Sequence, residues 1–131
     1  RLQQASITDE LTGLYNRRYF NLIATRELNR CRREGRPLAM AMLDVDRFKA
    51  YNDRYGHSQG DQALAALARA MDSQVNRATD YLFRLGGEEF AVLLVGVGQE
   101  EARQHVERVR RAVSDQQLAH EGSERGVVTV S

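Results

Sequence analysis

The chain has 131 residues, of which 42% are apolar and 28% are charged, and its formal net charge is +1. This is the size and balance of one folded domain, and it excludes both a disordered acidic tail and a strongly basic nucleic-acid-binding protein. No apolar run approaches the ~20 residues of a membrane-spanning helix, and the single cysteine, Cys31, excludes an internal disulfide. We therefore expect a cytoplasmic location, although a longer parent protein could be membrane-anchored.

The first half of the chain predicts a helix, a strand and a second helix. Residues 1–8 hold too few apolar residues to define a structure. Asn16 is placed to cap a helix that continues to about Glu34, because apolar residues recur at three- and four-residue steps. Gly35 and Pro37 then end that helix. A short apolar run over 38–43 predicts a buried strand, and an apolar stripe predicts a helix over about 62–75.

The second half predicts a β-hairpin, a long helix and a last strand. Two apolar runs, 81–85 and 90–95, flank the glycines Gly86 and Gly87, which is typical of a tight hairpin connection. A third helix is expected over about 99–118 and a strand over 127–130. This order favours a mostly antiparallel sheet with helices packed on one face.

Two carboxylates, Asp44 and Asp46, follow the first predicted strand directly. Oxygen ligands of this kind suit Mg²⁺, and in a regular strand the two side chains share a face while Val45 points the other way. The alternative is a pair of acidic residues in an ordinary loop or helix cap. The motif alone does not separate these two interpretations.

The hairpin connection carries two adjacent glutamates, Glu88 and Glu89, after two glycines. Neighbouring side chains of an extended chain point in opposite directions. We therefore expect different roles for them: one toward a metal ion shared with Asp44, and the other toward another group. A solvent-exposed hairpin tip of the same composition is the simpler alternative for this motif by itself.

The segment from Asp44 to Asp61 is rich in polar groups that could hold a nucleotide. Lys49 is the only lysine of the chain, all other basic residues being arginine; it is either a compact charge for a phosphate or a result of codon bias. The backbone N–H groups of residues 46–49 could cradle phosphate oxygens if the chain turns there. Asn52, His57 and Asp61 could contact a base, and Asp61 could equally cap the next helix.

Three motifs, taken together in their order along the chain, resemble the GGDEF-domain diguanylate cyclases. Residues 86–90 are similar to the family signature in its GGEEF form, residues 9–18 are similar to its opening motif, and residues 44–61 are similar to its nucleotide loop. The resemblance covers the chain from Asp9 to Ser131. It implies an α+β fold like the palm of nucleotide cyclases, with a central, mostly antiparallel sheet flanked by helices.

The resemblance also implies the reaction and its metal site. Two GTP molecules would be joined into cyclic di-GMP with release of two pyrophosphates. Asp44, the backbone carbonyl of Val45 and Glu88 would hold Mg²⁺, so that Val45 takes the place that the strand pattern gave to Asp46. Glu89 would act near the attacking hydroxyl group.

The substrate contacts and the assembly follow from the same resemblance. Lys49 would stabilise phosphate, while Asn52 and Asp61 would read guanine with His57 nearby. A carboxylate accepts from the N1–H and N2–H groups of guanine but faces a lone pair at N1 of adenine, so GTP should be preferred to ATP. Each domain would hold one GTP, so a homodimer is needed for catalysis.

A last motif, Arg77 followed by Asp80, is separated from Gly86 by five residues, as in the product-inhibition site of the family. The resemblance implies that Arg77 and Asp80 bind cyclic di-GMP, with Arg108 as a secondary contact. An Arg-x-x-Asp pattern alone is usually a surface ion pair.

The resemblance further predicts the domain organisation. Residues 1–8 are expected to end a linker from an upstream sensor domain, and 9–131 to form the GGDEF catalytic domain with its C-terminal part missing. Two other functions remain open: an inactive GGDEF module that binds GTP or cyclic di-GMP and signals through a partner, and a plain interaction domain.

Overall fold

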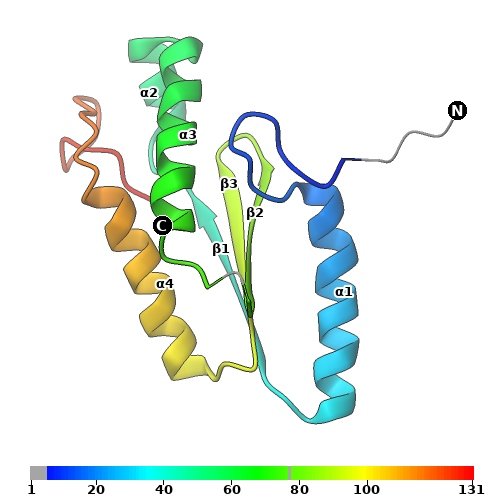
Figure 1. Ribbon diagram of the computed structural model, residues 1–131. Helices are drawn as coiled ribbons and strands as arrows, with labels where there is room; N and C mark the ends of the chain where they lie inside the picture. The colour runs from blue at the N-terminus through cyan, green and yellow to red at the C-terminus, as the bar shows by residue number, and fades with distance from the viewer. Residues whose placement is uncertain (1–5, 77) are drawn as a thin grey trace, which may run out of the picture.

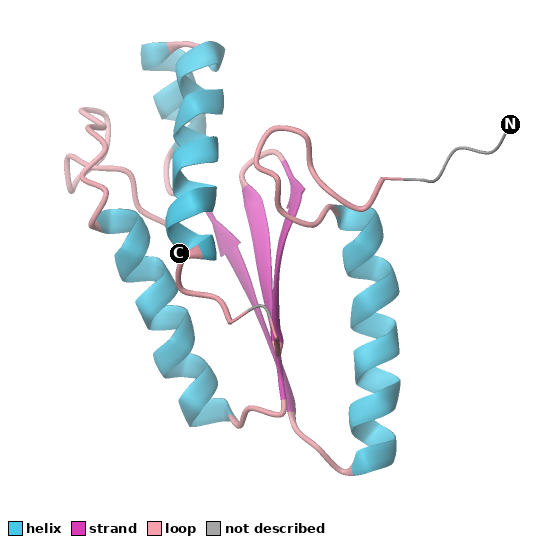
Figure 2. Cartoon of the chain, in the orientation of Figure 1, coloured by secondary structure: helices cyan, strands magenta, loops and turns pink. Residues whose placement is uncertain are grey.

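The computed structural model describes residues 6–76 and 78–131, which form an α+β fold around an antiparallel three-stranded sheet. The elements are α1(Arg17–Glu34), β1(Leu38–Asp44), α2(Phe48–Tyr55), α3(His57–Asp72), β2(Asp80–Gly86), β3(Glu89–Val95) and α4(Gln99–Ser114). The strands lie in the order β1-β3-β2, and helices flank the sheet (Figures 1 and 2). The predicted fold class is confirmed.

Helix α1 has the boundaries that its capping residues predict. The Asn16 side chain accepts a hydrogen bond from the Tyr19 N–H at 3.0 Å, which satisfies one of the free donors of the first turn. Gly35 ends the helix in the left-handed region, at φ 66°.

The expectation that helices pack on one face of the sheet is wrong. Phe90, Val92 and Leu94 of β3 join the cluster formed with α3 and α4, whereas Ala91 and Leu93 join a second cluster with α1. Figure 1 shows α1 on one side of the sheet and α3 and α4 on the other. Because β3 is apolar at every position from 90 to 95, both of its faces can be buried.

The segment between β1 and β2 holds two helices where one was predicted. Helix α2 (Phe48–Tyr55) was missed, and α3 begins at His57 rather than near residue 62. Gly56, at φ 90°, separates the two helices. Asp61 therefore lies within α3 and is not its N-cap.

The last predicted elements are shorter than expected. Helix α4 ends at Ser114. The segment 127–130 forms two isolated bridges, Ala119 with Val127 and Val45 with Val130, instead of a regular strand. The second bridge places the segment beside the end of β1. Within the described part of the chain, no helix combines the length and the apolar character that crossing a membrane requires.

Candidate active site

The end of β1 lies beside the turn of the β2–β3 hairpin. The two strands pair antiparallel in a register that sets Asp44 opposite Glu89, and the Val45 N–H donates to the Glu88 carbonyl at 3.1 Å. Two motifs that are far apart in sequence therefore meet through backbone hydrogen bonds alone. The predicted convergence of Asp44 with Glu88 is present in the structure.

The pKa values of Asp44 and Glu88 are both raised. Desolvation is the largest cause of the raised pKa of Asp44, followed by the charges of Glu89 and Asp46. The pKa of Glu88 is raised by desolvation and then by the charges of Asp44 and Glu89. Clustered negative charge of this kind is relieved by a bound cation.

Asp44, Glu88 and the Val45 carbonyl fit a divalent ion with oxygen ligands. In extended backbone the N–H and C=O of one residue point to the same side, so the Val45 carbonyl faces the hairpin as its N–H does. Among the residues that the structure describes, no group of three His, Cys, Asp or Glu side chains forms a metal cluster. The Val45 carbonyl could add a third protein oxygen to those of Asp44 and Glu88.

Asp46 is occupied by contacts with the end of the chain. Its Oδ2 atom accepts hydrogen bonds from Thr129 Oγ1 at 2.7 Å and from Ser131 Oγ at 2.9 Å. These bonds favour Val45 over Asp46 as the partner of Asp44 in holding a metal ion.

Arg84 fixes the hairpin turn to the N-terminal turn of the domain. Its Nε and Nη2 atoms donate to the Gly87 carbonyl at 3.0 and 2.8 Å, and its Nη1 atom lies 3.1 Å from both carboxylate oxygens of Asp9. Burial raises the pKa of Asp9, but hydrogen bonds from Thr12 and Arg84 outweigh it and lower that pKa overall. Sequence analysis missed this role, although Asp9 opens one motif and Arg84 lies two residues before another.

The predicted guanine contacts lie on α2 and α3. The Oδ1 atom of Asn52 is buried and has no hydrogen-bond partner among the described residues. Gly60 makes room for it, because a Cβ atom at residue 60 would collide with the Asn52 amide. Asp61 and His57 are exposed on α3. An unpaired buried acceptor is costly, and it suits a ligand with an N–H donor.

The predicted phosphate contacts lie at the start of α2. The chain does turn there: Arg47 adopts the left-handed region at φ 55° and precedes the helix. The Asp46 N–H already donates to Thr129 O, so only residues 47–49 of the expected cradle have uncommitted amides. Lys49 is 89% exposed and forms an ion pair with Asp53 at 3.2 Å.

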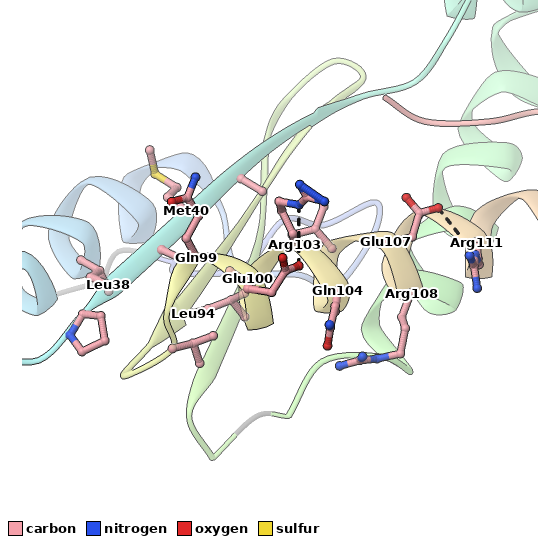
Figure 3. Close-up of a pocket in the computed structure, with 16 residues that line it drawn as sticks. Leu38, Met40, Leu94, Gln99, Glu100, Arg103, Gln104, Glu107, Arg108 and Arg111 are labelled. Carbon is pink, nitrogen blue, oxygen red and sulfur yellow. Dashed lines mark ion pairs between the residues drawn. The ribbon is translucent and has the colours of Figure 1, made fainter.

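Two of the predicted product-binding residues, Asp80 and Arg108, line different pockets. Arg77 lies outside the described residues. Asp80 is buried, accepts from Thr79 Oγ1 at 3.1 Å, lies 3.7 Å from His105 Nδ1 and lines a small pocket near the N-terminal turn. Arg108 is exposed on α4 and borders a groove of about 1000 Å³ between α4 and β1 (Figure 3).

A profile of the family described as "Diguanylate cyclase, GGDEF domain" matches residues 6–131. The chain is 38% identical over 118 residues to the "Probable diguanylate cyclase DgcC" of Escherichia coli, covering 90% of this chain and 32% of that protein. The curated relatives are thus about three or more times as long as the chain.

Solved structures are similar over nearly the whole chain. The diguanylate cyclase SiaD of Pseudomonas aeruginosa, solved with its activator SiaC, is 44% identical with a TM-score of 0.84, covering 97% of this chain and 48% of that chain. The GGDEF domain of DgcB from Caulobacter crescentus, solved in complex with c-di-GMP, is 30% identical with a TM-score of 0.87, covering 100% of this chain and 75% of that chain.

Proposed function

The chain belongs to the GGDEF domain family of diguanylate cyclases, and we propose on that premise that it condenses two GTP molecules into cyclic di-GMP and two pyrophosphates. The observation that carries this proposal is the strand register that sets Asp44 and Val45 beside Glu88 and Glu89. The reaction needs carboxylates at one point for the metal ion and for proton transfer, and this register supplies both.

Asp44, Glu88 and the Val45 carbonyl would hold Mg²⁺ at the triphosphate. When bound, the ion would neutralise phosphate charge and polarise the α-phosphate. The role of the protein is to fix three oxygen atoms through the β1–β3 pairing, while Lys49 swings from its exposed ion pair with Asp53 onto a phosphate.

Glu89 would receive the proton of the attacking hydroxyl. The 3′-oxygen of one GTP forms a bond with the α-phosphorus of the other, the bond to the β-phosphate oxygen breaks, and pyrophosphate leaves. Glu89 is exposed at the first position of β3, where a second molecule can reach it. The attack of one GTP on another needs two domains to face each other if each domain holds one GTP, so we propose a homodimer as the active species.

Asn52 and Asp61 would select guanine, with His57 nearby. The unpaired Oδ1 of Asn52 would accept an N–H of the base, and the exposed Asp61 carboxylate would accept from N1–H and N2–H. Adenine offers an acceptor at N1, so ATP would leave a carboxylate without its partner.

Product inhibition would use Arg77 and Asp80, with Arg108 as a secondary contact. Arg108 borders a different pocket from Asp80, which makes it the less direct of the proposed contacts. Replacing Arg77 with Ala is expected to weaken inhibition by cyclic di-GMP and to leave the initial rate unchanged. Unchanged inhibition would remove this assignment.

The test of the proposed function is turnover by the natural full-length protein, in which an upstream sensor would control the distance between two domains. The purified protein is incubated with GTP and Mg²⁺, and cyclic di-GMP is measured by chromatography. Product formation that stops with EDTA and is absent with ATP supports the proposal. GTP binding without product would support the inactive, partner-signalling module instead.

A further inference from the structure

His120 is a buried side chain that none of the proposed steps uses. It lies in the loop that follows α4, is fully buried, and packs edge-on against the rings of Tyr51 and Tyr55 of α2, with centroids 5.2 and 6.4 Å away. Its Nε2 atom lies 3.0 Å from the carbonyl oxygen of Arg47. The loop therefore contacts α2 at the turn that precedes it.

The hydrogen-bond partner of His120 indicates which ring nitrogen carries the proton. A carbonyl oxygen only accepts hydrogen bonds, so the proton lies on Nε2 and the imidazole donates to Arg47. The other nitrogen, Nδ1, is buried without a partner in the described part of the chain. The bond to the Arg47 carbonyl is therefore the one polar contact of the His120 side chain with the described residues.

Arg47 is the residue whose conformation the bond restrains. It is in the left-handed region at φ 55°, which costs a side-chain-bearing residue about 1 kcal/mol. The Arg47 carbonyl also accepts the Tyr51 N–H at 3.0 Å, so both of its lone pairs are engaged. No side chain caps α2 at this position. His120 thus supplies a restraint that the helix lacks.

We propose that His120 is a positioning residue for the triphosphate end of the nucleotide. It acts through Arg47, by holding the turn that presents the amides of residues 47–49 and the start of the Lys49 side chain. The proposal rests on the proposed function, because that function places a triphosphate at this turn. His120 itself touches no substrate.

The guanine end does not depend on the hydrogen bond of His120, although the His120 ring packs against α2. Asn52 lies one turn further along α2 and packs against Gly60 of α3, so its position depends on the contact between the two helices. Loss of the His120 bond should therefore weaken the binding of a triphosphate more than the binding of a monophosphate. A general loss of stability would not make this distinction.

The test compares the dissociation constants of GTP and GMP, measured by calorimetry with Mg²⁺ on the natural full-length protein. His120→Phe keeps the ring but loses the donor, and should weaken GTP binding about fivefold to tenfold while GMP changes less than twofold. His120→Gln offers an amide N–H to the same carbonyl and should stay within twofold of wild type for both nucleotides.

His105→Phe is the matched control, because it removes a similar imidazole bond, to the Gln74 carbonyl at 2.7 Å, away from α2. It should leave both dissociation constants unchanged.

Equal weakening of GTP and GMP binding by His120→Phe, or no weakening of either, overturns the proposal. If His120→Phe does not fold, a tenfold loss of GTP affinity in His120→Gln overturns it. Absence of cyclic di-GMP synthesis would overturn the proposed function alone, since binding is measured without turnover.

Discussion

The two sides of the candidate active site are held in different ways. On the carboxylate side, the strand register fixes Asp44 beside Glu88, and Arg84 holds the turn through the Gly87 carbonyl. On the nucleotide side, Lys49 is exposed and Asn52 Oδ1 is buried without a partner among the described residues. The carboxylate side is organised by contacts within the chain, whereas the polar groups of the proposed nucleotide side are exposed or have no partner among the described residues.

The largest effect on turnover is expected for Glu89, on the carboxylate side of the site. Glu89→Ala should lower turnover by about 10²–10⁴-fold, because the attacking hydroxyl loses its proton acceptor. The fold should survive, since backbone pairing and not the Glu89 side chain holds the turn. Synthesis of cyclic di-GMP and thermal unfolding measure the two quantities. A variant that unfolds would contradict a purely chemical role for Glu89.

The Arg84 contacts can be broken without touching a predicted ligand. Arg84→Ala removes the Arg84 donors from Asp9 and from the Gly87 carbonyl, and should reduce the free energy of unfolding by about 2 kcal/mol. Displacement of the turn should lower turnover by about 10–100-fold. The exposed Arg103, whose ion pair with Glu100 is 3.9 Å long, is the control; its change to Ala should alter stability by less than about 0.5 kcal/mol.

The nucleotide side can be disturbed at Gly60. In Gly60→Ala the added Cβ collides with the Asn52 amide and displaces it, so the KM for GTP should rise about tenfold. The stability should change little, because Ala favours a helix interior by about 1 kcal/mol over Gly and offsets part of the strain. Gln59→Ala, at the neighbouring exposed position, should have no effect on KM. An unchanged KM in Gly60→Ala would show that Asn52 does not contact the substrate.

The smallest effect concerns charge repulsion on the carboxylate side. A raised pKa in the folded state means that the ionised Asp44 destabilises the fold, and that this penalty is absent at low pH, where the group is protonated. In metal-free buffer, Asp44→Asn should therefore raise the melting temperature by about 1–3 °C at pH 7. The gain should vanish as the pH falls below about 4.

Adding Mg²⁺ should reverse the order of stability of the wild-type protein and Asp44→Asn. If Asp44 holds the ion, adding Mg²⁺ at pH 7 stabilises the wild-type protein by mass action and leaves Asp44→Asn unchanged. An equal response of both proteins to Mg²⁺ would contradict the proposed metal ligand.

Local sequence signals predicted the elements that depend on neighbouring residues. Asn16 and Gly35 set the ends of α1, and the glycine pair marked the hairpin. Helix α2 was missed because its short apolar pattern, Phe48, Tyr51 and Tyr55, lies among polar residues that were interpreted as a ligand loop. The two-sided packing of the sheet was visible in the unbroken apolar run of β3, but the topology was not.

The sequence predicted the convergence of Asp44 with Glu88, but not the contacts that support the candidate site. The motifs identified Asp44 and Glu88, whose convergence depends on strand pairing. The contacts of Asp46 with Thr129 and Ser131 join residues more than 80 positions apart, and His120 reaches Arg47 across 73 positions. Such contacts depend on tertiary packing, which periodicity and spacing do not encode.

The guanidinium of Arg84 gives the domain a stiff mechanical linkage. The Nη1 atom of the planar guanidinium contacts Asp9 in the N-terminal turn of the domain, and the Nη2 atom donates to the Gly87 carbonyl in the hairpin turn. If the N-terminal turn moves by about an ångström, either these hydrogen bonds lengthen or the hairpin turn moves with it. The hairpin turn that carries Glu88 and Glu89 is thereby connected through Arg84 to the first turn of the domain.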